Sequence, residues 1–118
     1  MRRRPLLLAA PLLVAGAARA QTARPGGWPE RAVRLIVPFA PGGLSDIVAR
    51  ALAQTLSPAL RQPVVVENRA GGGGVVGTDA VARAAPDGYT IGLCSAGALA
   101  IAPSLLPNLA YDTDPRIF

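Results

Sequence analysis

The chain has no histidine and no lysine, and only one of its 118 residues is a cysteine. Without histidine it cannot form a Ser–His or Cys–His catalytic pair, nor a histidine-based metal site. Cys94 lacks a partner for an internal disulfide and a base to activate it, so we expect a small buried side chain. The acidic residues show no metal-ligand spacing. The sequence therefore predicts no catalytic residue, no cofactor and no metal, and we do not expect an enzyme.

The first twenty residues have the pattern of a secretory signal. Three arginines (residues 2–4) precede an apolar run over residues 5–18, and Ala18 and Ala20 are the small residues that a signal peptidase reads. A membrane-spanning helix needs about 20 apolar residues, and this run is shorter. We predict a signal peptide at residues 1–20, cleavage after Ala20, and a periplasmic protein. Both the general and the twin-arginine export routes stay open.

Most of the positive charge belongs to this signal segment. The chain has a net charge of +5, and four of its twelve arginines lie within residues 1–20, where no acidic residue occurs. Beyond residue 20, eight arginines stand against seven acidic residues and form no basic patch. A nucleic-acid partner requires such a patch, so we expect none.

Strand-like and helix-like segments alternate beyond residue 20. Residues 21–30 are rich in Gly and Pro and predict a flexible leader. We expect strands at residues 33–37, 64–67 and 89–94, and helices at residues 45–60, 78–85 and 98–106. In the first helix, Ser45 is the expected N-cap and Pro58 the point where it kinks or ends, while Pro103 interrupts the third. The alternation predicts an α/β fold with a mainly parallel sheet flanked by helices.

Two of the expected loops are candidate binding sites, because ligands in open α/β sheets bind beyond the carboxyl ends of the strands. In the first loop, adjacent glycines let backbone N–H groups approach a ligand, and the following helix directs its positive dipole end there. This suits an anion such as a carboxylate, and a tight turn without a ligand is the alternative. The second loop offers one hydroxyl and several N–H groups. The candidate substrate-binding residues are Phe39, Ala40, Pro41, Gly42, Gly43, Ser45 and Asp46 in the first loop, and Ser95, Ala96, Gly97 and Ala98 in the second.

The glycine run in residues 71–77 matches the spacing G-x-G-x-x-G of dinucleotide-binding proteins. Four residues separate the expected strand from the first glycine of this pattern, whereas the fingerprint has a tight turn. No acidic residue follows at the distance needed to bind a ribose hydroxyl, about 20 residues on. We therefore interpret the run as a loop that allows close packing at the next helix. A nucleotide-binding exported enzyme remains the less favoured alternative.

Three segments, in this order and spacing, resemble one family. They read P-F-A-P-G-G-L-S-D (residues 38–46), V-V-V-E-N-R-A-G-G-G-G (residues 64–74) and D-G-Y-T (residues 87–90). Over residues 29–118 the chain resembles the amino-terminal part of the tripartite tricarboxylate transporter substrate-binding proteins, also called the Bug family. The resemblance implies part of a type II periplasmic binding protein, in which two α/β lobes close on a ligand. It also implies capture of a small carboxylate for membrane transporter subunits, by a monomer.

The resemblance also places residues 39–46 and 95–98 at the ligand and makes residues 31–118 an incomplete amino-terminal lobe. Family members often carry Pro at the position of Ala40, Asn at that of Ala102, and Ser or Thr near Ala98. These departures leave the identity of the carboxylate open. Because the family pattern continues beyond Asp112, a truncated and non-functional gene fragment is the alternative interpretation.

Overall fold

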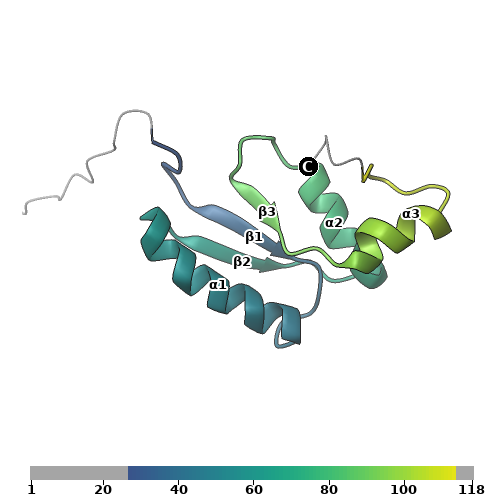
Figure 1. Ribbon diagram of the computed structural model, residues 1–118, viewed down its shortest axis with the longest axis horizontal. Helices are drawn as coiled ribbons and strands as arrows, with labels where there is room; N and C mark the ends of the chain where they lie inside the picture. Colours follow the sequence, from purple (N-terminus) through teal and green to yellow (C-terminus); the bar gives the residue numbers. More distant parts are fainter. Residues whose placement is uncertain (1–26, 114–118) are drawn as a thin grey trace, which may run out of the picture.

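The computed structural model describes residues 27–113, which form a three-stranded parallel sheet with helices on both faces (Figure 1). The predicted signal peptide lies outside the described residues, as do most of the predicted leader and the last five residues. The strands are β1 (Val33–Val37), β2 (Val64–Asn68) and β3 (Thr90–Gly92), in the spatial order β2-β1-β3. The prediction of an α/β fold with a parallel sheet is confirmed.

Strand β1 is central, and four of its five residues are buried. Val33, Leu35 and Val37 face helix α1 (Leu44–Leu60) and form the core with its alanines. Side chains alternate along a strand, so Ile36 points to the opposite face. There Gly92, the register partner of Ile36 on β3, lies against Val81 of α2 (Val75–Ala82). Helices α1 and α2 therefore cover opposite faces of the sheet, as right-handed β-α-β connections require.

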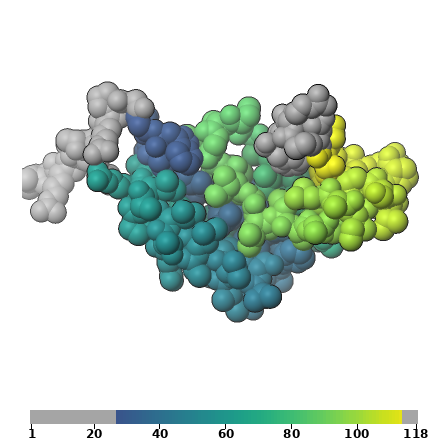
Figure 2. Space-filling view, in the orientation of Figure 1, coloured from purple at the N-terminus to yellow at the C-terminus, as the bar shows by residue number. Residues whose placement is uncertain are grey.

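Helix α1 contacts the sheet through small residues. Its buried positions are Asp46, Ala49 and Ala53, with Leu56 and Leu60 packed against the core. A second apolar face of the helix, with Ile47 and Val48, is 60% and 48% exposed at these two residues. Helix α1 lies at the surface of the molecule, where Figure 2 shows it in teal. The helical spacing alone does not show which of these two faces is buried, because alanine is only weakly apolar although its small side chain permits the closest approach to a sheet.

Helix α1 ends at Leu60 as predicted, but its start and the effect of Pro58 differ from the prediction. The helix begins at Leu44 with Gly43 as its N-cap, so the prediction of Ser45 as the cap is wrong. It also continues through Pro58 to Leu60 and ends at Arg61, which has a left-handed backbone. The last turn is held by Ser57, whose hydroxyl donates to the Ala53 carbonyl (2.7 Å) and accepts the Val64 N–H of β2 (3.0 Å).

The second half of the chain keeps the predicted order with shifted boundaries. Helix α2 starts before Thr78, since the four glycines at 71–74 all adopt positive φ and turn the chain early. Strand β3 is shorter than predicted, and Cys94 follows it, half-buried. A wide helical turn, η2 (Gly97–Ile101), continues into α3 (Ala102–Leu105), with Pro103 in its first turn. The helical run therefore passes through Pro103 to Leu105, and the prediction that Pro103 interrupts the helix is wrong. Within residues 27–113, no helix is long and apolar enough to cross a membrane.

Candidate functional site

The first predicted loop leaves the carboxyl end of β1 and leads directly into α1 (Figure 1). Gly42 has a φ of 83°, a left-handed conformation that glycine adopts without strain. The Gly43 N–H bonds weakly to the Ala40 carbonyl at 3.4 Å, which closes a tight turn. The loop thus turns the chain back so that the start of α1 lies at the edge of the sheet where β1 ends.

The start of α1 is open. The N–H groups of Leu44, Ser45 and Asp46 are in its first turn, where a helix has no internal acceptors. In the described part of the chain, no side chain caps this end. Uncapped N–H groups and the positive end of the helix dipole favour a negative group from outside.

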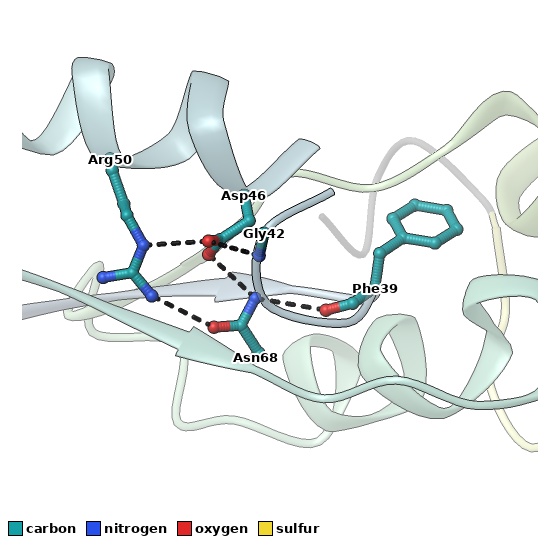
Figure 3. Close-up of polar contacts among 5 residues, drawn as sticks. All are labelled: Phe39, Gly42, Asp46, Arg50 and Asn68. Atoms are coloured by element: carbon teal, nitrogen blue, oxygen red, sulfur yellow. Dashed lines mark hydrogen bonds and ion pairs between the residues drawn. The ribbon is translucent and has the colours of Figure 1, made fainter. Parts of the chain in front are cut away.

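Asp46 does not point into this open space. It is 3% exposed, and both of its carboxylate oxygens accept hydrogen bonds from within the protein (Figure 3). Oδ2 accepts the Gly42 N–H and Arg50 Nε, both at 2.9 Å, and Oδ1 accepts Asn68 Nδ2 at 2.9 Å. The bonds from Arg50, from the Gly42 backbone and from Asn68 hold the pKa of the Asp46 carboxyl well below its ordinary value.

The second predicted loop follows β3 and forms a compact turn. The Ser95 hydroxyl accepts the Ala98 N–H at 3.2 Å, and the Ser95 carbonyl accepts the Leu99 N–H at 3.1 Å. Ala98 is fully buried, and its carbonyl accepts a 2.7 Å bond from the Tyr111 hydroxyl. Burial is the main cause that raises the pKa of Tyr111. Ser95, Ala96 and Gly97 are therefore the more accessible part of this loop.

The two candidate loops pack against each other at Gly74 of the glycine run. A Cβ at Gly74 would lie 3.2 Å from Ser95 Oγ, 3.5 Å from Phe39 Cζ and 3.7 Å from Ala98 Cβ. Residues of both candidate loops therefore meet around a glycine whose missing side chain lets them approach. This agrees with the interpretation of the run as a packing loop.

One residue of this region was missed from the sequence, Asn68, whereas Gly74 belongs to the predicted packing loop. Asn68 is the last residue of β2, one residue beyond the end of the predicted strand. A side-chain amide where a parallel strand ends could have signalled its role, since such ends converge on the ligand side of the sheet.

A cavity of about 810 Å³ opens elsewhere, beside β3 and the end of α2. Its lining includes Val81, Ile91, Leu93, Cys94 and Leu99, and no lining side chain is charged. No residue of the two candidate loops lines this cavity. Within residues 27–113, no three His, Cys, Asp or Glu side chains are grouped to hold a metal ion.

Comparison with known proteins identifies the family. The model of the "Tripartite tricarboxylate transporter family receptor" matches residues 48–116. Protein BugT of Bordetella pertussis is 56% identical over 85 residues, which are 71% of this chain and 26% of that protein. A UPF0065 protein of Pseudomonas sp. (strain P51) is 41% identical over 113 residues, 96% of this chain and 33% of its relative. The chain thus spans about a third or less of the length of these relatives.

Solved structures share the fold. The periplasmic binding protein BugD has a TM-score of 0.69 and 53% identity, over 73% of this chain and 28% of that one. MatC from Rhodopseudomonas palustris with bound malate has a TM-score of 0.68 and 42% identity, over 73% and 29%. R. palustris Rpa4515 with adipate has a TM-score of 0.69 and 37% identity, over 74% and 29%. The prediction of a partial periplasmic-binding-protein lobe is confirmed. Members of the family are periplasmic receptors rather than enzymes, and this chain belongs to the tripartite tricarboxylate transporter receptor family.

Proposed function

We propose that residues 31–118 are the amino-terminal ligand-binding part of an extracytoplasmic receptor that captures a small carboxylate for a tripartite tricarboxylate-type transporter. The observation that carries this proposal is the uncapped start of α1, directly after the glycine turn at residues 42–43. Relatives of the same fold hold malate and adipate, both of which are carboxylates.

The chemistry of capture follows from this geometry. A ligand carboxylate at the start of α1 receives N–H groups of the first helical turn and the positive end of the helix dipole. Water can bridge the carboxylate to more distant N–H groups, since a bridged contact is enthalpically nearly as good as a direct one. The Phe39 ring, which points away from the Asp46 cluster (Figure 3), and the Ser95 hydroxyl lie where the two loops meet. They would contact the rest of the ligand.

The remaining predictions are part of this proposal. The protein is exported with cleavage after Ala20, acts in the periplasm as a monomer, and binds no nucleic acid. It performs no catalysis, consistent with a chain that contains no histidine. The nucleotide-binding alternative loses support because the glycine run is packed against Phe39, Ser95 and Ala98.

A chimera tests the proposal. Residues 27–113 of this chain would replace the matching segment of MatC, and binding of malate, adipate and ATP would be measured by calorimetry. We expect a dicarboxylate to bind and ATP not to bind, because the segment supplies the start of α1 to a complete receptor. A folded chimera that binds ATP but no dicarboxylate contradicts the proposal. The chain by itself is expected to bind a dicarboxylate only weakly, with a Kd of about 1 mM or higher.

A further inference from the structure

Asn68 and Asp46 connect the sheet to the loop before α1, although neither faces the open start of the helix. We propose that they are positioning residues, which hold residues 39–43 in the conformation that directs the first N–H groups of α1 toward a bound carboxylate. This inference rests on the proposed function, because it assigns to Asp46 an indirect role at the same site. It changes Asp46 from an expected ligand contact to a support of the loop.

The sheet fixes the position of Asn68. In the parallel register of the two strands, Asn68 is paired with Val37, the last residue of β1. The next residue, Arg69, continues the pairing through its N–H, which donates to the Val37 carbonyl at 2.8 Å. The Asn68 amide is therefore held next to the point where β1 becomes the loop.

The Asn68 amide forms hydrogen bonds to both ends of the loop. Asn68 Nδ2 donates to the carbonyl of Phe39 at 3.1 Å and to Asp46 Oδ1 at 2.9 Å. Phe39 is where the loop begins, and Asp46 lies in the first turn of α1. The Gly42 N–H, which donates to Asp46 Oδ2 at 2.9 Å, fixes the middle of the loop. With three fixed points, the loop reaches the ligand already ordered, which lowers the entropic cost of binding.

Arg50 makes this arrangement compatible with an anionic ligand. An uncompensated Asp46 carboxylate would repel a ligand carboxylate at the start of the same helix. Arg50 Nε pairs with Asp46 Oδ2 at 2.9 Å, and its Nη2 lies 3.4 Å from Asn68 Oδ1. Figure 3 shows the guanidinium reaching both side chains from one turn further along α1. The cluster therefore has no net charge, and the helix dipole sets the potential at the open end.

The experiment compares amide exchange and ligand binding by NMR in the full chain and in the variant Asn68→Ala. Malate and adipate are the probes, and the shifts of the amides of Gly43, Leu44 and Ser45 report binding. Loss of both Asn68 bonds should speed Gly42 amide exchange about tenfold while the β1 amides keep their protection. Carboxylate affinity should fall by a similar factor, about tenfold. Asn108→Ala, at an exposed asparagine, is the control and should change neither readout.

A second pair of variants separates charge from folding. Arg50→Gln should weaken carboxylate binding at low salt and recover as salt screens the Asp46 charge, whereas Arg50→Lys should bind normally. Arg83→Gln is the matched control, since Arg83, at the C-cap of α2, forms an i,i+4 ion pair of the same kind with Asp79. This pair of variants also decides the question if Asn68→Ala does not fold, because the Arg50 side chain is 54% exposed and its loss disturbs the core little.

The outcomes distinguish this inference from the proposed function. Unchanged Gly42 exchange and unchanged affinity in Asn68→Ala overturn the positioning role. The same holds if Asn108→Ala or Arg83→Gln produces an equal loss. If the unmodified chain binds neither probe, binding is compared in the MatC chimera, and a folded chimera that binds neither probe marks a failure of the proposed function. Gly42 exchange then decides the positioning role by itself: faster exchange in Asn68→Ala supports it, and unchanged exchange refutes it.

Discussion

Gly77 of α2 packs against the chain segments that leave β1 and β2. A Cβ there would lie 2.5 Å from Pro38 Cβ, 2.6 Å from Pro38 Cα and 2.8 Å from the Arg69 carbonyl oxygen. Two of these neighbours are backbone atoms that cannot turn aside. Gly77 therefore sets the distance between α2 and the chain segments that leave β1 and β2.

The substitution Gly77→Ala should destabilise the protein by about 2 kcal/mol, even though alanine is the better helix former, because the backbone must move to admit the methyl group. Urea denaturation followed by circular dichroism measures the change. Gly97→Ala is the control, because its Cβ would meet only Ser95 Oγ at 3.6 Å, an ordinary contact. Equal unfolding midpoints for the two variants would contradict this account of α2 packing.

At the scale of an element, α1 presents two apolar faces to different surroundings. The face with Ala49 and Ala53 is buried against β1 and β2, and the face with Ile47, Val48 and Leu52 is exposed. Small residues let the helix axis lie close to the sheet, and close packing of this kind leaves no room for larger side chains. The exposed face has no such limit.

The same substitution at two positions of α1 tests this difference. Ala49→Leu should destabilise the protein by about 2–3 kcal/mol, since three further carbons must enter a closed contact. Ala51→Leu, on the exposed face, should change the stability by less than about 0.5 kcal/mol. Thermal unfolding of both variants gives the comparison. If Ala51→Leu is the more destabilising of the two, the orientation of α1 described above is wrong.

At the scale of the whole molecule, two carboxylates, those of Asp46 and Glu67, form ion pairs with arginines of the sheet, of α1 and of the segment after β2. Asp46 pairs with Arg50, and Glu67 pairs with Arg34 and Arg69, both at 2.6 Å. The bonds from Arg34 and then from Arg69 hold the pKa of Glu67 below its ordinary value, as those around Asp46 do for that residue. Both groups are thus more acidic in the folded than in the unfolded protein.

This predicts a loss of stability in acid. A carboxyl group whose pKa is lower in the folded than in the unfolded protein contributes its full stabilisation above the unfolded pKa. The ordinary pKa values are 3.8 for Asp46 and 4.5 for Glu67. As the pH falls below these values toward the folded pKa, the stabilisation is lost. The urea midpoint should therefore fall as the pH is lowered through this range, and less so in Glu67→Gln and in the double variant Asp46→Asn/Glu67→Gln. A midpoint that is flat with pH in the unmodified chain, or equally steep in the double variant, would refute this.

The sequence by itself determined the order of strands and helices, the parallel sheet, the family, and the two loops at the candidate site. These follow from patterns within a few residues of one another, such as the β-branched run at 33–37 and the glycine turn at 42–43. Only the tertiary structure decided which face of α1 is buried, where the helices begin, and what Asp46 bonds to. Contacts of this kind join residues that are distant in the chain. The Asn68 amide that binds Asp46 comes 22 residues after it, and Ser95, which packs against Gly74, comes after β3. Local spacing cannot express such contacts, because the parallel register of the sheet is what brings them together.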